Sequence, residues 1–361
     1  TPNFAWVKEL GHRIMKSVQL TIGGQPIEVE YTPELFHFLH LLKADMNQIR
    51  GYNIMIGNTE EMYTVNTLQR SITRLYIPLR YWFNKHFGNG IPLINMMNSE
   101  MILNITINDL SNLLYTDSGT IFSKEPKLGC KLLVGYVYID EDERMKMADK
   151  KLEYLIEKMN YNGELYFSHN DLIATSGMTD ATNYNSISLS QVNPTFNVKL
   201  RIQDPTKYII WYLIFEDLTT VQPVDVLDWN KFGYNVRNSS GTMVSYSDIV
   251  SSMTIYFGGT VREQAKHENF YKYVVPHKSG CSSLSDGMYM YSFALYPLMI
   301  QPSGSANFSE LDDCSIDIVF NPTITQLLID NPNLRARMGL YGCAYNILRV
   351  MSWCTGLAFF S

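Results

Sequence analysis

Hydrophobic and polar residues alternate along much of this chain, which is the pattern of half-buried β-strands. In "KSVQLTIGGQPIEVEY" the apolar residues Val18, Leu20 and Ile22 alternate with polar ones, and the alternation resumes at residues 27–31 after the glycine pair. Paired glycines between alternating segments suit a tight turn. The sequence therefore predicts a β-hairpin at residues 18–31.

Two stretches carry helical spacing instead. Residues 32–51 begin with Thr32 and Pro33, which favour a helix start, and keep apolar residues three or four apart until Gly51. Residues 141–159 begin with acidic side chains and place their last apolar residues on one helical face. We expect one helix in each stretch.

The remaining pattern divides into two blocks of strands. The first block has strands at residues 75–81, 101–107 and 131–140. The second has strands at 196–202, 207–215 and 251–260, a hairpin over 289–320 and a last strand over 344–360. Between the blocks, residues 160–194 are rich in Asn, Ser, Thr and Gly, which is typical of a linker or a long surface loop.

This pattern predicts an N-terminal domain over 1–159, a linker over 160–194 and a C-terminal domain over 195–361. The chain of 361 residues is long enough for two cores. Recurrent strands with turn signals between them favour sandwiches or barrels over alternating β-α-β units.

The amino-acid composition limits the classes of function that this chain can have. Charged residues make up only 18% of the chain, whereas aromatic residues reach 13%, so we expect much of the surface to meet protein. A large β core would also raise the aromatic content. The net charge of −6 and the lack of a basic run disfavour direct nucleic-acid binding. Five cysteines without a paired motif indicate neither a disulfide framework nor a zinc site, and no apolar run is long enough for a membrane span.

Candidate chemistry is sparse. His37 and His40 have a spacing that can chelate a metal, but no acid or cysteine nearby completes the set, and helix-surface residues explain them better. The acidic run 140–143 lacks the central glycine of a calcium loop and suits the first turn of a helix. N-glycosylation triplets begin at Asn104, Asn238 and Asn307. No catalytic motif is present, so the sequence predicts neither an enzyme nor a cofactor.

One segment is distinctive. "YSFALYPLMIQPSGSANFSELDDCSIDIVF" (residues 291–320) closely resembles the near-C-terminal hairpin of the major capsid proteins of nucleocytoplasmic large DNA viruses. The shared string comprises Ser292, Phe293, Ala294, Leu295, Pro297, Gln301, Pro302, Ser303, Gly304, Asn307 and Ser309.

Other pieces resemble the same family in the same order. They are "WVKELGHRIMKSVQLTIGGQPI", "LYIPLRYWFNKHFGNGIPLI", "VYIDEDERMKMADKKLEYLIE" and "YNILRVMSWCTGLAF", and "DWNKFGY" is similar to the asfarvirus branch. The resemblance therefore covers almost the whole chain. It departs from the family at the start, where members carry a further strand that nothing here supplies.

The resemblance implies an all-β fold of two consecutive eight-stranded antiparallel jelly rolls, the first possibly incomplete at its N-terminus, with short helical insertions. It also implies a structural capsid protein of the virion, assembled in the host cytoplasm as a homotrimeric, pseudo-hexameric capsomer. Partners would be other copies of the chain, then minor capsid and penton proteins. Three alternatives stay open: a lectin-like carbohydrate-binding module, a cupin-like jelly-roll enzyme, and a double jelly-roll scaffolding homologue.

Overall fold

The first part of the chain builds a small antiparallel sheet. Its strand order is β3-β2-β4, with β2 at Met15–Ile22, β3 at Gln25–Tyr31 and β4 at Met101–Ile107. β2 and β3 pair in antiparallel register around the glycine turn, which confirms the predicted hairpin. Two short strands, β1 (Phe4–Trp6) and β5 (Leu114–Thr116), pair separately.

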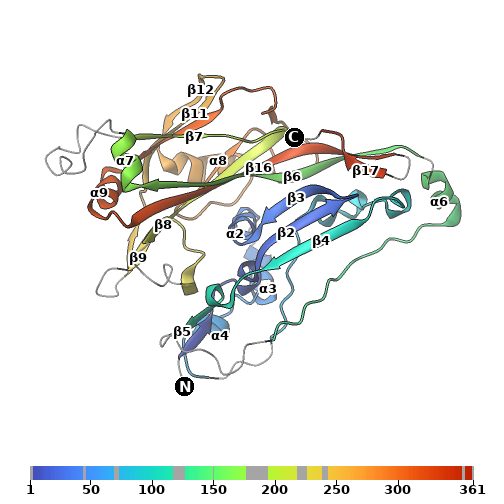
Figure 1. The fold of residues 1–361 in the computed structure, drawn as a ribbon, viewed down its shortest axis with the longest axis horizontal. Helices are drawn as coiled ribbons and strands as arrows, with labels where there is room; N and C mark the ends of the chain where they lie inside the picture. Colours follow the sequence, from blue (N-terminus) through green and yellow to red (C-terminus); the bar gives the residue numbers. More distant parts are fainter. Residues whose placement is uncertain are drawn as a thin grey trace.

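The coordinates are a computed structural model, drawn in Figure 1. It describes residues 3–43, 46–68, 73–116, 127–148, 150–175, 194–217, 226–237, 243–351 and 354–359.

Short helices occupy the connections of this first part. They are α1 (Leu10–Ile14), α2 (Thr32–Leu42), α3 (Met46–Met55), α4 (Glu60–Tyr63) and α5 (Trp82–Lys85), with 3-10 turns at Phe87–Asn89, Leu93–Asn95 and Leu110–Asn112. The prediction of one helix over 32–51 is wrong, because α2 ends at Leu42 and α3 continues through Gly51. A glycine in an exposed helix costs only about 1 kcal/mol, so it need not end one.

Two strands predicted in this part are absent from the described residues. Residues 75–81 form no ladder, since Pro78 lacks the backbone N–H that a strand interior needs. Residues 131–140 also pair with no described strand, although their sequence has strong β propensity.

The predicted helix over 141–159 is correct only in its first half. α6 spans Glu141–Ala148, with acids in its first turn as expected, and strand β6 spans Leu152–Ser168. β6 pairs along almost its whole length with β16 (Leu334–Met351), and this ladder overrides the helical spacing.

β6 also corrects the predicted linker. Residues 160–168 belong to the strand and are followed by α7 (His169–Thr175), whereas the predicted loop over 176–193 lies outside the described residues. The domain bounds 1–159 and 195–361 stay a prediction.

The second part is a sandwich of two sheets. The larger sheet runs β13-β8-β16-β17, with β14 pairing on β8 and β6 on β16; the smaller runs β12-β11-β15-β7. The new strands are β7 (Thr195–Lys199), β8 (Pro205–Asp217), β11 (Val250–Phe257), β12 (Thr260–Lys266), β13 (Met288–Ser292), β14 (Ala306–Asn307), β15 (Ser315–Phe320) and β17 (Cys354–Leu357). A separate pair joins β9 (Tyr234–Arg237) to β10 (Met243–Tyr246), and helices lie at Val226–Asp228, Phe270–Val274, Val275–Lys278 (α8) and Pro322–Asp330 (α9).

Aromatic side chains fill the space between these two sheets. Trp211, at the centre of β8, is fully buried, with ring centroids 5.6 Å from Tyr271 and 5.8 Å from Tyr289. Phe320 of the smaller sheet contacts Phe215 of the larger one, at 6.2 Å. Since β8 is apolar on both faces, it reads as a nearly continuous hydrophobic run, as expected of a strand at the centre of a core.

The two C-terminal strand predictions need correction. The predicted hairpin over 289–320 is wrong, because β13 and β15 lie in different sheets and residues 293–314 cross between them. The predicted last strand over 344–360 is two strands, since β17 turns back to pair with the end of β16.

Candidate functional site

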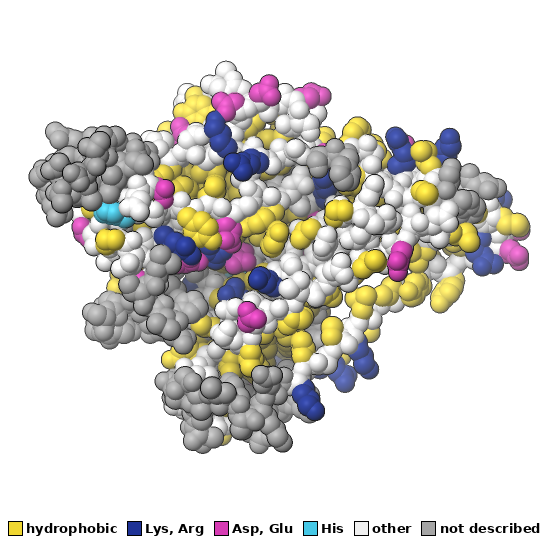
Figure 2. Space-filling view, in the orientation of Figure 1, with side chains coloured by type: hydrophobic (Ala, Val, Ile, Leu, Met, Phe, Trp, Pro, Cys, Tyr) yellow, Lys and Arg dark blue, Asp and Glu magenta, His cyan; other side chains and the backbone are white. Residues whose placement is uncertain are grey.

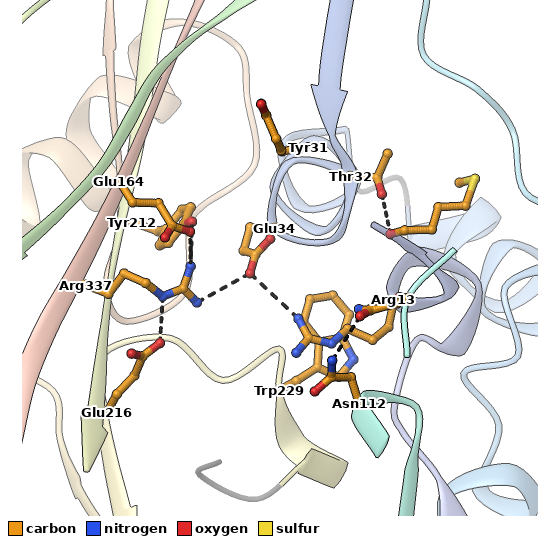
Figure 3. A network of polar contacts seen from close by, with 12 residues as sticks. Arg13, Tyr31, Thr32, Glu34, Asn112, Glu164, Tyr212, Glu216, Trp229 and Arg337 are labelled. Atoms are coloured by element: carbon orange, nitrogen blue, oxygen red, sulfur yellow. Dashed lines mark hydrogen bonds and ion pairs between the residues drawn. The ribbon is translucent and has the colours of Figure 1, made fainter. Parts of the chain in front are cut away.

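A partly buried ion-pair network joins the two parts of the chain, and its centre is Arg337 on β16 (Figure 3). The guanidinium donates to Glu216 on β8 and to Glu164 on β6, each at 2.7 Å, and to the Tyr212 hydroxyl at 3.2 Å. It also lies 3.5 Å from Glu34 on α2. The Arg337 cation on β16 therefore connects β8 and β6 of the larger sheet to helix α2 in the first part of the chain.

Glu34 extends the network toward the N-terminus. Its carboxylate lies 3.8 Å from Arg13 of α1, and the Arg13 guanidinium stands over the Trp229 ring at 5.1 Å. Burial lowers the pKa of Arg13. Burial would also lower the pKa of Arg337, but Tyr212 and the three carboxylates outweigh it and raise that pKa. Both arginines stay charged, so the network is a permanent electrostatic connection.

A second buried network lies around Glu9. Its carboxylate accepts hydrogen bonds from His12 at 2.9 Å, from His37 at 2.8 Å and from the side-chain amide of Asn230 at 3.0 Å. Burial would raise the pKa of Glu9, but the two histidines lower it well below its usual range. The expectation that His37 lies on the helix surface is wrong, because it is buried at 5% exposure against Glu9, whereas the ring of His40 stacks on Tyr52 with centroids 4.4 Å apart. Within the described ranges, no group of three His, Cys, Asp or Glu side chains could hold a metal ion.

Two carboxylates between β3 and β6 have no hydrogen bond from a histidine or another side chain among the described residues. Glu28 and Glu30 lie on one face of β3, at 5% and 1% exposure. Glu28 accepts a hydrogen bond from the Met159 backbone N–H of β6 at 2.6 Å, while neither oxygen of Glu30 has a hydrogen-bond partner among the described residues. Burial raises the pKa of Glu28 to about 7, and burial together with the nearby Glu28 raises the pKa of Glu30 well above its usual range. The contact between β3 and β6 is therefore more stable at acidic pH, where these two carboxyl groups are protonated.

The predicted signature residues form a braced loop rather than a hairpin. The backbone N–H groups of Phe293 and Ala294 both donate to the Lys207 carbonyl on β8. Further along, Ser303 receives hydrogen bonds from Leu295 and Tyr296.

The last signature residues, Gly304, Asn307 and Ser309, fix the C-terminal end of this loop. Gly304 has φ +136°, and a Cβ there would lie 2.7 Å from the Phe293 carbonyl oxygen. The Ser309 hydroxyl accepts the Asp204 N–H at 2.9 Å, and the Asn307 side chain accepts the Ser309 N–H at 3.3 Å. The side chains of Leu295 and Tyr296 point into solvent, at 70% and 60% exposure.

The glycosylation triplets stay predictions. Asn104 is exposed on β4, Asn307 is half-buried in β14, and Asn238 lies outside the described residues. Among the helices that the structure describes, none is long and apolar enough to cross a membrane.

Comparison with known proteins assigns the family. A family model described as "Large eukaryotic DNA virus major capsid protein" matches residues 143–356, and one described as "Major capsid protein N-terminus" matches residues 1–140. The chain belongs to this major capsid protein family. Its function is that of a structural protein of the virion capsid of large DNA viruses.

Relatives from several viruses agree over nearly the whole chain. The major capsid proteins of Phaeocystis pouchetii virus, Pyramimonas orientalis virus and Paramecium bursaria Chlorella virus 1 are 25%, 26% and 25% identical. These matches cover 98%, 98% and 96% of this chain, and 82%, 78% and 79% of the relatives.

Solved structures give the fold. A quasi-atomic model of the PBCV-1 virus capsid superposes with a TM-score of 0.68 at 20% identity, over 100% of this chain and 87% of that one. The Faustovirus major capsid protein gives 0.65 at 13% identity, over 97% and 74%. The all-β, double jelly-roll fold class expected from the sequence is confirmed.

Sequence reasoning missed the ion-pair networks completely. Arg13, Glu34, Glu216 and Arg337 are far apart in the sequence, and none stands in a motif. The only available signal was the placement of charged residues inside otherwise apolar strands, as in "LRARMGLYG".

We predict that Arg337→Gln destabilises the protein by about 2 kcal/mol, because it removes the cation shared by Glu34, Glu164 and Glu216 and leaves these partly buried carboxylates with only Arg13 and Arg335 as counter-ions. Arg349→Gln is the matched control on the same strand, since its pair with Glu153 is about half exposed. It should cost at most about 1 kcal/mol. Urea unfolding of both variants measures the difference, and equal losses would contradict a junction held by Arg337.

We predict that Glu30→Gln removes a loss of stability that the native chain shows as pH rises. Because the pKa of Glu30 is raised in the folded state, the unfolded chain releases its proton first, and stability falls above the ordinary pKa of a glutamate. Relative to the variant, the native chain should lose stability between pH 5 and pH 8. Denaturation midpoints at both pH values test this, with Glu100→Gln as an exposed control that should leave the native trend unchanged.

We predict that Gly304→Ala destabilises the protein by about 1–3 kcal/mol, from its positive φ and its approach to Phe293. Gly24→Ala separates the two causes, because Gly24 has φ +78° but no atom within 4 Å of the added Cβ. The Gly304 variant should lower the melting temperature more. If the two variants melt together, the close approach to Phe293 contributes nothing.

Proposed function

We propose that three copies of this chain associate around a threefold axis into a pseudo-hexameric capsomer, and that capsomers tile an icosahedral shell. Family membership over the whole chain is the observation that carries the proposal. Two jelly rolls in one chain give a trimer six similar wedges, which suit a hexagonal lattice. The contacts within such a ring are head-to-tail and close by rotation.

The surface supports self-association. Many large apolar side chains are exposed, including Phe87 at 83%, Met97 at 76% and Leu133 at 78%. A surface of this kind is unusual for a protein that stays alone in water. Copies of the same chain are the partners that a shell supplies in largest number.

The finer parts of the proposal follow from the same assignment. The chain acts through shape and contacts, without catalysis. In the assembled particle it contacts neighbouring capsomers, minor capsid proteins and penton proteins, and assembly takes place in the host cytoplasm.

Light scattering after size-exclusion chromatography tests the capsomer. We expect a particle of about three times the 41.5 kDa chain mass that persists on dilution. A correctly folded chain, verified by circular dichroism, that stays monomeric at high concentration would contradict the proposal. Binding to a glycan array by such a monomer would instead favour a lectin-like module.

A further inference from the structure

A lysine, a carboxylate and a side-chain amide meet at one buried place in the larger sheet. Lys158 lies on β6, Asn346 on the neighbouring β16, and Asp204 directly before β8, on the other side of β16 (Figure 1). Their exposed fractions are 7%, 2% and 3% in that order. Charged side chains ordinarily lie on the surface, as the dark blue and magenta groups in Figure 2 do. This buried cluster therefore calls for an explanation.

The register of the sheet brings the three residues together. Lys158 is paired with Ala344, so Lys158 and Asn346 are diagonal neighbours on one face of the sheet. On the other side of β16, Ala344 pairs with Thr206, two residues after Asp204. The lysine side chain is long enough to pass the small Ala344 and reach the carboxylate. Its amine thus ends at the place where Asn346 and Asp204 meet.

One carboxylate oxygen contacts both nitrogen atoms. Asp204 Oδ2 lies 2.8 Å from Lys158 Nζ and accepts a hydrogen bond from Asn346 Nδ2 at 3.3 Å. Asn346 Nδ2 also donates to the Phe359 carbonyl at 2.9 Å. The amide oxygen Asn346 Oδ1 accepts the Ile347 backbone N–H at 2.7 Å. Such a donor polarises the carbonyl and stabilises negative charge that develops on its oxygen.

These are the groups that an amide bond between two side chains requires: an amine nucleophile, a polarised carbonyl carbon and a carboxyl group that moves protons between them. A lysine amine attacks a carbonyl only in its neutral form. Transfer of one proton along the hydrogen bond between Lys158 Nζ and Asp204 Oδ2 gives a neutral amine and a neutral carboxyl group. A site closed to water favours an ion pair over this neutral pair less strongly than water does.

We propose that Lys158 and Asn346 form an isopeptide bond within the chain, with Asp204 as the proton carrier. Asp204 first takes a proton from the ammonium group, and Lys158 Nζ attacks Asn346 Cγ. Asp204 then gives its proton to Nδ2 and takes the second proton of Nζ. The Nζ–Cγ bond is formed, the Cγ–Nδ2 bond breaks, and ammonia leaves with the proton that Asp204 holds, as an ammonium ion. The step needs no oxidant, reductant or co-reactant.

The bond joins β6 covalently to β16 and closes the chain between residues 158 and 346 into a loop. That loop contains β8 and every strand of the smaller sheet. A cross-link of this kind restricts the unfolded chain, as a disulfide does, but it is not reversed by reduction. It is formed within one subunit and does not depend on the proposed capsomer.

The mass of the intact, folded chain tests the proposal. After prolonged incubation below the melting temperature, we expect the full chain to be lighter than its sequence by one ammonia. A tryptic digest should then contain a branched peptide that joins Lys158 to Asn346, with the branch placed by fragmentation. A cyclic imide at an asparagine also loses ammonia, so the branched peptide decides. A folded chain that keeps its full mass would overturn the proposal, and so would the loss of one water with Lys158 joined to Asp204.

Three variants test the assigned roles. Lys158→Arg removes the amine but keeps a cation beside Asp204. Asp204→Asn removes the proton carrier and keeps a residue type that tolerates the φ of +70° at this position. Both variants should keep their full mass. Lys207→Arg is the matched control, because Lys207 is similarly buried but its partner Glu157 is shared with Lys85 rather than with an amide. The control should lose ammonia as the native chain does.

Circular dichroism verifies that each variant is folded. If one variant fails to fold, the other variant and the native mass still decide. A folded Asp204→Asn chain that yields the branched peptide would overturn the role of Asp204. Light scattering separates this inference from the proposed capsomer: a native chain that carries the bond but stays monomeric would overturn the capsomer and leave the bond standing.

Discussion

The structure depends on one partly buried cation, the Arg337 guanidinium, which lies within ion-pair distance of carboxylates on three elements. Arg337 lies on the longest strand, and its planar guanidinium meets Glu216, Glu164 and Glu34 from different directions. An ammonium group could not reach all of these carboxylates in fixed geometry, because it lacks the rigid fork of donors. Removing charge from water is costly, so this arrangement contributes little net stability compared with an apolar packing. Its value is that only one placement of α2 against the larger sheet satisfies every charge.

The same junction explains the unusual composition. Many of the tyrosines lie inside the protein, among them Tyr208, Tyr289 and Tyr341. The ring of Tyr341 on β16 stacks on Tyr161 of β6, with ring centroids 4.8 Å apart. The ring of Tyr212 packs in the core, and its hydroxyl oxygen accepts a hydrogen bond from Arg337. The sequence-based expectation that tyrosine marks a protein-facing surface is therefore only part of the picture. A large β core accounts for much of the aromatic content, and the low charge reflects a core that reaches across both parts of the chain.

The local hydrophobic pattern predicted those strands in which apolar and polar residues alternate. It failed where pairing with a distant strand determines the secondary structure. β2, β3 and β4 were predictable because one face of each is apolar. β6 was not, since Leu152, Ile156 and Met159 fit a helix equally well, and only the ladder with β16, almost two hundred residues away, selects the strand. The signature loop was found as a string of residues, but its shape was not, because Gly304 and Ser303 act on backbone groups that the sequence does not place. The ion pairs of Arg337 and Glu9 were missed for the same reason.

Residues 131–140 are an exception, because their local pattern and the structure disagree. Their sequence predicts a strand more strongly than β4 does, yet the single chain gives them no partner among the described residues. In a minimally frustrated protein, local preference and tertiary environment agree. This chain belongs to a double jelly-roll family, in which the strands of each jelly roll come from one chain. The segment 131–140 and the edge of β4 that is unpaired among the described strands both lie in the N-terminal part, so the strand preference of the segment is a preference for that jelly roll.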